Sequence, residues 1–316
     1  MNTNRPRIAI CFFGIPRSLE KTANSITENV IEPAAAIGDV TLLAHFFEQK
    51  KISNPRSGEI QVQLQKNNQH LPFDKIIATP PDTKEIQQLI QDSATYGDAW
   101  GDDFGSLRNL IHQLHSLKKA YALATEKHAD IFAFIRPDLN YHDSLYSVFE
   151  EAQSLHRSGA SRIFTPDWQR WGGANDRFAI AVGKKAADAY GYRVESARRF
   201  CEEFGRPLHS ERLLAFSLKL HGVQISHIRH RASRVRANDI QSWEDFNPNW
   251  SKKIQEQLKV QVRPKSKILY KVALLMSTTA FRILFASRYR NIDPPNGVYQ
   301  RSKKDEKAMR RKKTSQ

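Results

Sequence analysis

The sequence has few cysteines and no long uninterrupted hydrophobic run. Its 316 residues include only two cysteines, too few for a disulfide-stabilised scaffold. No stretch of about 18 uncharged apolar residues is present, so a transmembrane helix is not expected. The chain also lacks a zinc-type Cys/His spacing, a Walker lysine motif and a dinucleotide glycine fingerprint. Cys11 and Cys201 fall within predicted core elements and are expected to be buried free thiols, which suits a reducing cytoplasm.

The positive charge is gathered at the C-terminal end of the chain. The formal net charge is +16, and residues 251–316 alone hold 18 Lys and Arg against 4 Asp and Glu. Residues 1–250 are therefore almost neutral and form the predicted globular domain. Residues 251–316 form a predicted basic tail that is disordered from about residue 297. No nucleic-acid partner is expected, because the neutral body offers no basic footprint.

An amphipathic pattern occupies residues 268–286 of this tail. Apolar residues recur there at helical spacing, while Lys271 and Arg282 argue against a membrane-spanning helix. Together with the basic clusters after residue 300, the pattern predicts attachment to an anionic membrane surface that salt weakens. Packing of the same helix on the globular domain is the alternative. The apolar run at residues 8–15 is too short for a signal peptide and predicts a strand, so we expect a cytoplasmic protein, peripheral at the inner face of the membrane.

Strand and helix patterns alternate along the globular domain. The predicted strands are residues 7–13, 40–47, 75–78, 130–135, 162–165, 178–182 and 223–228. Helices are predicted from Ser18 to before Pro33, from Ser106, and at residues 184–204 and 210–220. Residues 50–69 are polar and without a period, which predicts an insertion loop. The alternation is typical of an α/β domain with a mainly parallel sheet flanked by helices, in which functional residues gather where strands end.

Two strand ends carry candidate phosphate-binding residues. After the first strand, Gly14 allows a ligand to approach the backbone, and Arg17 has the guanidinium geometry that suits a phosphate. After the strand at residues 130–135, Asp138 is suited to hold a divalent cation, and Arg136 is suited to neutralise phosphate charge. The alternatives are an ordinary strand-to-helix turn with a surface arginine, and an Asp138 that only caps a turn and pairs with Arg136.

A loop rich in tryptophan and glycine carries candidate sugar-binding residues. It reads WQRWGGANDRF from residue 168 to residue 178. The ring faces of Trp168 and Trp171 suit stacking on sugars, and Arg177 is grouped with them as a sugar or acceptor contact. Asp176 lies just before a strand and is a candidate general base or ligand of a ring hydroxyl. A structural loop held by its large aromatic side chains is the alternative.

Two further residues are candidates from their positions. Glu211 lies in the first turn of the helix at residues 210–220, where it is either a second candidate catalytic carboxylate or a complement to the helix dipole. His227 ends the last predicted strand and is a candidate metal ligand, although a structural histidine is the more common outcome.

Taken in order, these segments resemble bacterial polysaccharide-type glycosyltransferases with the GT-A fold. The resemblance covers about residues 7–230: the turn from Gly14 to Arg17, a strand ending near His45, a helix with Gln113 and Ser116, the strand end at Arg136–Asp138, and the block GGANDRFAI at residues 172–180. It implies a nucleotide-sugar donor, a glycan or lipid-linked glycan acceptor, and transfer of the sugar to a hydroxyl group. Gly14, Arg17, Arg136 and Asp138 would then bind the donor.

One departure from that family concerns the metal. The resemblance implies an Asp-x-Asp motif for Mn²⁺ or Mg²⁺, whereas this chain has Arg136 and Asp138 at the corresponding strand end. A cation at Asp138 and a metal-independent reaction, in which Arg136 or Arg17 carries the diphosphate charge, are both left open.

Two other functions stay open as alternatives. The turn Gly14–Ser18 is similar to the phosphosulfate loop of sulfotransferases, but Leu19 and Glu20 follow where that loop continues with glycine and threonine. The tryptophan loop is also compatible with a carbohydrate-binding protein that has no catalytic activity.

Overall fold

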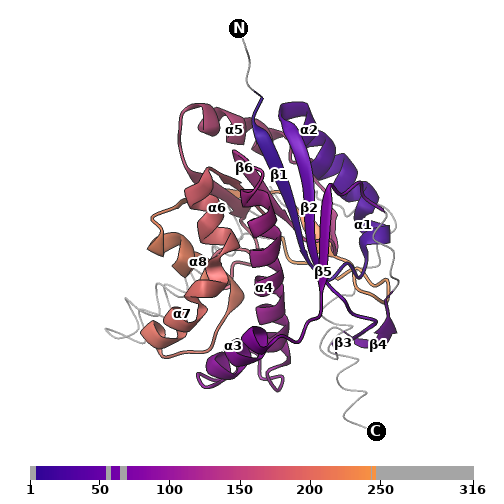
Figure 1. Ribbon diagram of the computed structural model, residues 1–316, viewed down its shortest axis with the longest axis vertical. Helices are drawn as coiled ribbons and strands as arrows, with labels where there is room; N and C mark the ends of the chain where they lie inside the picture. The colour runs from indigo at the N-terminus through magenta and orange to yellow at the C-terminus, as the bar shows by residue number, and fades with distance from the viewer. Residues whose placement is uncertain (1–4, 55–57, 65–69, 243, 247–316) are drawn as a thin grey trace, which may run out of the picture.

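A seven-stranded sheet forms the centre of the computed structural model, which describes residues 5–54, 58–64, 70–242 and 244–246 (Figure 1). The strands lie in the order β10-β8-β9-β6-β1-β2-β5. Their bounds are Arg7–Gly14 (β1), Asp39–Phe47 (β2), Lys75–Thr79 (β5), Ile131–Ile135 (β6), Arg162–Pro166 (β8), Ala179–Val182 (β9) and Gln224–Ile228 (β10). All neighbouring pairs are parallel except those of β9, which is antiparallel to both β6 and β8. The predicted α/β class with a mainly parallel sheet is confirmed.

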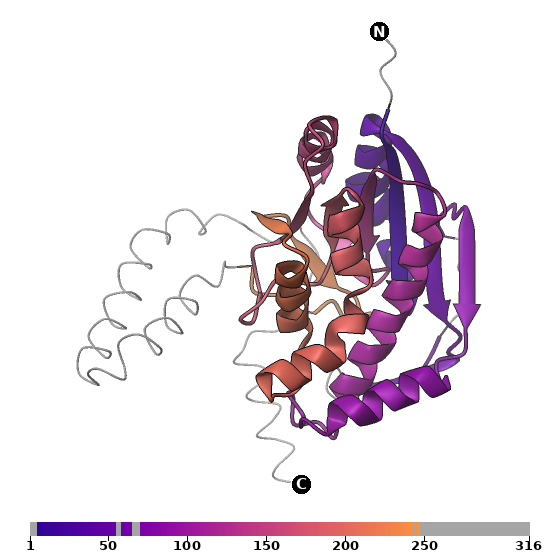
Figure 2. The ribbon, with the colours of Figure 1, turned by 60° about the vertical axis from the view of Figure 1, so that its left-hand side comes forward.

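Helices cover both faces of this sheet (Figure 2). Along β1, Ile8, Ile10 and Phe12 face the helices α1 (Leu19–Ile26), α2 (Glu32–Ile37) and α5 (Tyr146–Arg157). The alternate residues, including Cys11, face α4 (Gly105–Thr125), α6 (Lys184–Gly191) and α8 (Ser210–Leu220). Because both faces are buried, the strand is apolar throughout, as parallel strands usually are. Cys11 and Cys201 are both buried free thiols, as predicted.

A third apolar cluster extends the core beyond the sheet. The helices α3 (Lys84–Ala94) and α7 (Ala197–Phe204) pack there with α4 and α8 around Ile111, Leu114 and Leu213. The predicted helix at residues 184–204 is in fact α6, a 3₁₀ turn at Arg193–Ser196, and α7. The sequence analysis did not identify α3 or α5.

Two predictions near the N-terminus are wrong. The predicted loop at residues 50–69 contains the antiparallel hairpin of β3 (Lys51–Asn54) and β4 (Glu59–Gln63). The first helix also does not end before Pro33, because a π-helical turn at Thr27–Ile31 joins α1 to α2. Pro33 lies in the first turn of α2, where its missing N–H group is tolerated. Ser18 makes no capping hydrogen bond, and its hydroxyl instead donates to the carbonyl oxygen of Val235 at 2.8 Å.

A second small sheet brings a late segment of the chain to the end of β6. The short strand β7 (Leu139–Tyr141) pairs antiparallel with β11 (Ala232–Arg234). The N–H group of Val235 donates to the carbonyl oxygen of Asp138 at 2.8 Å. Residues 232–242 therefore lie beside the loop that follows β6.

The strand order reverses between β1 and β6. From β1 the chain crosses to β2 on one side of β1, through α1 and α2 on one face, whereas β6 lies on the other side and is reached through α4 on the opposite face. In open α/β sheets the loops at such a reversal diverge and leave a ligand-binding crevice at the carboxyl ends of the strands. The residues that follow β1 and β6 are therefore the first place to look for a site.

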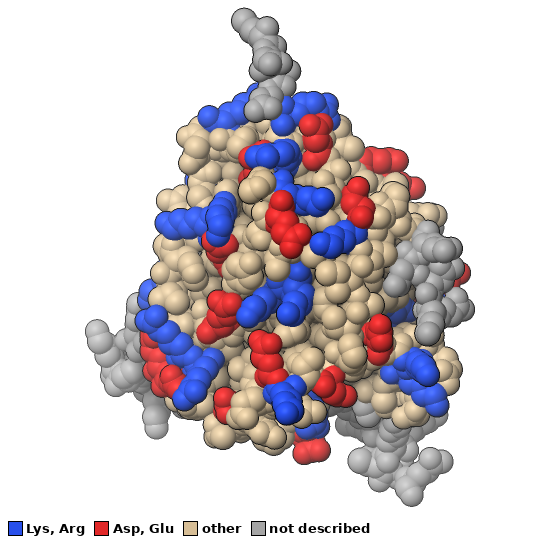
Figure 3. Space-filling model, viewed as in Figure 1, with Lys and Arg blue, Asp and Glu red and all other residues tan. Residues whose placement is uncertain are grey.

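The predictions for residues 251–316 lie outside the described residues. Within the described ranges, none of the helices combines the length and the apolar character needed to cross a bilayer. The face in Figure 3 shows basic and acidic side chains intermixed, in agreement with the near-neutral charge of residues 1–250.

Candidate functional site

The turn after β1 is held by buried hydrogen bonds. Gly14 has a φ of +106°, a conformation that residues with a Cβ rarely adopt. Its N–H group donates to the Ser116 hydroxyl at 2.7 Å, and that hydroxyl donates to the carbonyl oxygen of His45 at 2.7 Å. The His45 ring lies 3.0 Å from both Ser116 Oγ and Thr79 Oγ1. Burial lowers the pKa of His45 to about 4, so a neutral ring supports the turn.

Arg17 and Arg136 converge on Asp138. Nη2 of Arg17 lies 2.6 Å from Oδ2 of Asp138. Arg136 donates to both oxygens of the same carboxylate, from Nε to Oδ1 at 2.9 Å and from Nη2 to Oδ2 at 2.8 Å. Asp138 is buried; burial opposes its ionisation, but the two guanidinium groups hold its pKa well below the usual range. The structure thus brings together three of the predicted donor-binding side chains.

Glu59 adds a second carboxylate from the β3–β4 hairpin. It is fully buried, and it accepts from Nη1 of Arg17 at 3.2 Å and from the N–H group of Ala237 at 2.9 Å. Nη1 of Arg236 lies 3.8 Å from Glu59 Oε2. The hairpin and the segment after β11 therefore meet over Arg17.

Asp176 is the centre of a neighbouring group of charges. Its carboxylate accepts a short hydrogen bond from the hydroxyl of Ser210 and lies 3.9 Å from Nη2 of Arg193 and 4.0 Å from Nη1 of Arg177. Asp176 is buried, which alone would raise its pKa, but the two arginines reverse the shift and lower it. Gln113 joins the two groups, since it accepts from Arg136 at 3.0 Å and donates to Asp176 at 3.5 Å.

Glu244 completes this second group. Nε of Arg234 donates to Glu244 at 2.6 Å, and Nη2 of Arg177 lies 3.9 Å from the other oxygen of the same carboxylate. We call the whole network the arginine cluster. Its members are Arg17, Arg136, Arg177, Arg193, Arg234, Arg236, Glu59, Asp138, Asp176 and Glu244.

The tryptophan loop packs against the start of α8. The N–H group of Ala174 donates to the carbonyl oxygen of Glu211 at 2.9 Å. A Cβ at Gly173 would lie 1.9 Å from that oxygen, so only glycine allows this approach. Nε of Arg212 donates to the carbonyl oxygen of Trp171 at 3.3 Å. The contact places the exposed Trp171 beside the first turn of α8.

The two tryptophans differ in exposure. Trp171 is 41% exposed. Trp168 is fully buried, donates through Nε1 to the carbonyl oxygen of His230 at 2.9 Å, and contacts Phe246 edge to face. The prediction that Trp168 stacks on a sugar is therefore corrected, because its ring faces are covered by the protein.

Glu211 lies beside His209, with which the sequence analysis grouped it, and His209 contacts Trp100, which that analysis did not single out. Oε2 of Glu211 is 3.2 Å from Nδ1 of His209, whose ring stacks on Trp100 with centroids 5.4 Å apart. Ser210, which lies between His209 and Glu211 in the chain, is the residue that binds Asp176. Both predicted catalytic carboxylates are thus connected through the start of α8.

The candidate metal ligands are not brought together. Asp138 follows β6, whereas His227 lies in β10, and β8 and β9 separate these strands. The ring nitrogens of His227 face Thr165 Oγ1 at 3.4 Å and Nη1 of Arg170 at 2.9 Å. Within the part of the chain that the structure describes, no three His, Cys, Asp or Glu side chains are grouped to hold a metal ion.

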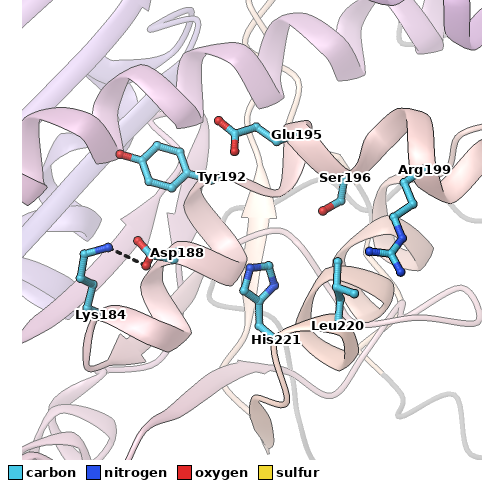
Figure 4. Close-up of a pocket in the computed structure, with 8 residues that line it drawn as sticks. All are labelled: Lys184, Asp188, Tyr192, Glu195, Ser196, Arg199, Leu220 and His221. Atoms are coloured by element: carbon cyan, nitrogen blue, oxygen red, sulfur yellow. Dashed lines mark hydrogen bonds and ion pairs between the residues drawn. The ribbon is translucent and has the colours of Figure 1, made fainter.

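A groove of about 450 Å³ lies elsewhere, between α6, α7 and α8 (Figure 4). Lys184 and Asp188 form an ion pair of 2.6 Å at one end, and Tyr192 and His221 also line it. None of the predicted site residues borders this groove.

The sequence analysis did not identify five charged members of the arginine cluster. They are Arg193, Glu59, Arg234, Arg236 and Glu244. Glu59 lies in β4, in the segment that was predicted to be a loop. Arg234 and Arg236 follow the last predicted strand, and their spacing of two residues was the available signal, since it places both on one side of an extended chain.

No protein-family model matches the chain, and no curated protein matches it either. Among solved structures, it is similar to mouse xyloside xylosyltransferase 1 in its apo form, with 11% identity and a TM-score of 0.34 over 71% of this chain and 84% of that one. It is also similar to core-mannan synthase A from Aspergillus fumigatus in an Mn/GDP form, with 11% identity and a TM-score of 0.39 over 73% and 74% of the two chains. Both TM-scores are below 0.5, so the function is argued from the residues of this chain.

Proposed function

We propose that this protein is a glycosyltransferase that moves a sugar from a nucleotide-sugar donor to a hydroxyl group of a glycan or lipid-linked glycan. The observation that carries the proposal is the arginine cluster at the strand-order reversal. Arg17 follows β1 and Arg136 follows β6, and both sit at the carboxyl ends of these strands. Nucleotides bind at this position in open α/β sheets, and guanidinium groups are suited to their phosphates.

The transfer step needs a leaving group and a base. The bond between the anomeric carbon and the diphosphate oxygen breaks, and its electron pair passes to the diphosphate. The acceptor oxygen forms the new bond to that carbon and gives up its proton to a base. Glu211 suits the role of base in an inverting reaction, because its backbone carbonyl oxygen contacts the tryptophan loop at Ala174 and its chain neighbour Ser210 binds Asp176. Asp176 suits a positioning role better, since a carboxylate with a lowered pKa is a weak base.

Trp171 and Arg177 are the proposed contacts for the sugar or acceptor. Trp171 is 41% exposed, so part of its side chain can be reached by a sugar, for which a tryptophan ring is a suitable contact. Arg177 donates to Gln169 at 3.1 Å, which ties the same loop to the arginine cluster. A surface-polysaccharide acceptor is proposed from the sequence resemblance alone.

The proposed location is the cytoplasmic face of a membrane. It is supported by the charge of residues 251–316, which would attract an anionic surface. The test is sedimentation of the full chain with vesicles containing phosphatidylserine at low and high salt. Binding that is equal on neutral vesicles, or that salt leaves unchanged, would contradict this location.

Binding of nucleotides by the full-length protein tests the activity class. UDP, GDP, TDP, CMP and adenosine 3′,5′-bisphosphate would each be titrated in a thermal-shift assay, with and without Mn²⁺. We expect stabilisation by one of the nucleotides that carry sugars. Stabilisation by the bisphosphate alone would favour the sulfotransferase alternative. Binding to glycans with no effect of any nucleotide would favour the carbohydrate-binding alternative.

A further inference from the structure

Asp138 does not fit the role of a metal ligand. Its Oδ1 accepts from Arg136, and its Oδ2 accepts from both Arg136 and Arg17. A divalent cation at this carboxylate would lie beside two guanidinium groups and would be repelled by both. The carboxylate is already neutralised by the arginines, and it fixes the direction in which their remaining N–H groups point.

The arginine cluster carries more positive than negative charge. Around Asp138 and Glu59 stand three arginines: Arg17, Arg136 and Arg236. Around Asp176 and Glu244 stand the other three: Arg177, Arg193 and Arg234. Each half therefore holds three guanidinium groups against two carboxylates, joined by the ion pairs described above. The cluster has one unbalanced positive charge in each half.

Two of the six arginines have a lowered pKa through burial and this surplus, whereas burial of Arg136 is outweighed by its pairing with Asp138, which raises the pKa of Arg136. Burial and the charges of Arg234 and Arg17 lower the pKa of Arg236 to about 9. Burial and the charge of Arg177 likewise lower the pKa of Arg234. An arginine stays charged in proteins, so crowding of this kind is relieved by an anion rather than by loss of a proton.

Unused hydrogen-bond donors accompany the surplus charge. Nε of Arg177 and Nε and Nη2 of Arg193 are buried and have no hydrogen-bond partner in the structure. Buried donors of this kind are costly unless a ligand or water satisfies them. The side chains of Arg17, Arg177 and Arg236 remain 11–13% exposed, so a ligand can reach part of each.

We propose that the arginine cluster binds the diphosphate of the donor directly, in place of a divalent cation, and that Arg234 and Arg236 are donor-binding residues, while Arg177 adds its charge to the cluster beside the sugar. The inference rests on the proposed function. A nucleotide-sugar diphosphate has a negative charge on each phosphate group, which matches one surplus charge in each half of the cluster. The same guanidinium groups would stabilise the charge that builds up on the leaving diphosphate during transfer.

The test measures binding without metal. The full-length protein is titrated calorimetrically with UDP, GDP, TDP and inorganic pyrophosphate, in EDTA and again in Mn²⁺. We expect at least one of these diphosphates to bind in EDTA, with an affinity within about threefold of that in Mn²⁺. Binding that requires the metal would overturn this inference and leave the glycosyltransferase proposal standing. Failure of every diphosphate under both conditions would count against both.

Variants assign the residues. Arg236→Gln should weaken diphosphate binding about tenfold or more, because a hydrogen-bonded charge is lost. Arg229→Gln is the matched control, since Arg229 is 66% exposed and its nearest acidic partner is Asp167 at 4.0 Å. Arg236→Lys keeps the charge and serves as a second variant if urea titration shows that Arg236→Gln is unfolded. Unchanged binding in a folded Arg236→Gln protein, or an equal loss in Arg229→Gln, would overturn the assignment.

Discussion

Nη2 of Arg17 lies 2.6 Å from Oδ2 of Asp138, although the two residues are 121 positions apart. One follows β1 and the other follows β6, and these neighbouring parallel strands end at the same edge of the sheet. The contact therefore follows from the strand order rather than from local sequence. It makes Asp138 the anchor of two arginines, so a substitution at Asp138 should affect both of them.

Asp138→Asn should destabilise the fold as well as the site. Loss of the carboxylate leaves Arg17 and Arg136 crowded and without their shared anion, and breaking a buried ion pair in this way costs about 3–5 kcal/mol. Urea denaturation would show the lower free energy of unfolding. Asp39→Asn is the control, because Asp39 pairs with Arg5 at the surface and should change stability little. Similar unfolding midpoints for the two variants would contradict the anchoring role.

His45 should make stability fall in mild acid. Its pKa is about 4 in the folded protein and 6.5 in the unfolded chain, so the unfolded state binds the extra proton between these values. Stability is then complete above pH 6.5 and decreases by about 3 kcal/mol as the pH falls to 4. Urea denaturation at several pH values would measure this slope.

The matching variant is His45→Asn, which should flatten the slope between pH 6.5 and 4. Other histidines with a lowered pKa, such as His115 and His142, will leave part of it. His128→Asn, in an exposed turn, should leave the slope as it is in the native protein. If His45→Asn keeps the full slope, the buried neutral ring is not its source.

Trp168 and Trp171 should respond to alanine in opposite ways. Trp168→Ala removes a fully buried ring and should cost about 3–5 kcal/mol of stability. Trp171→Ala should leave stability nearly unchanged and reduce retention of the protein on immobilised glycans. Urea denaturation and a glycan array separate the two effects. If both variants keep their glycan binding, the tryptophan loop is not part of the sugar site.

The sequence predicted the centre of the fold better than its periphery. The strands β1 and β6 contain continuous apolar runs because helices cover both of their faces, and this pattern is visible without a structure. The hairpin of β3 and β4 lies outside the seven-stranded sheet. The polar–apolar alternation of β4, EIQVQ, is a strand signal that the sequence analysis did not use.

The residues of the site also differ in how well the sequence predicted them. Arg17 and Arg136 were identified because each follows a predicted strand. Their shared partner Asp138 was identified in the same way, but Glu59 was not, since its ion pair with Arg17 depends on where the chain folds back. The hydrogen bond from Ala237 to Glu59 joins residues 178 positions apart, and no local pattern encodes it. Burial of Trp168 was missed for the same reason, because the segment near His230 covers it.

Glu211 and Asp176 should separate into a catalytic and a positioning role. Glu211→Gln removes a proton acceptor and should lower kcat about 10²- to 10⁴-fold, with little change in the KM for the donor. Asp176→Asn loses the anion that faces Arg177 and Arg193, so it should weaken donor binding and lower the free energy of unfolding. The measurement is steady-state transfer from the nucleotide sugar whose nucleotide binds, with urea denaturation of each variant. A large loss of kcat in a stable Asp176→Asn protein, together with an active Glu211→Gln protein, would reverse the assignment and make Asp176 the base.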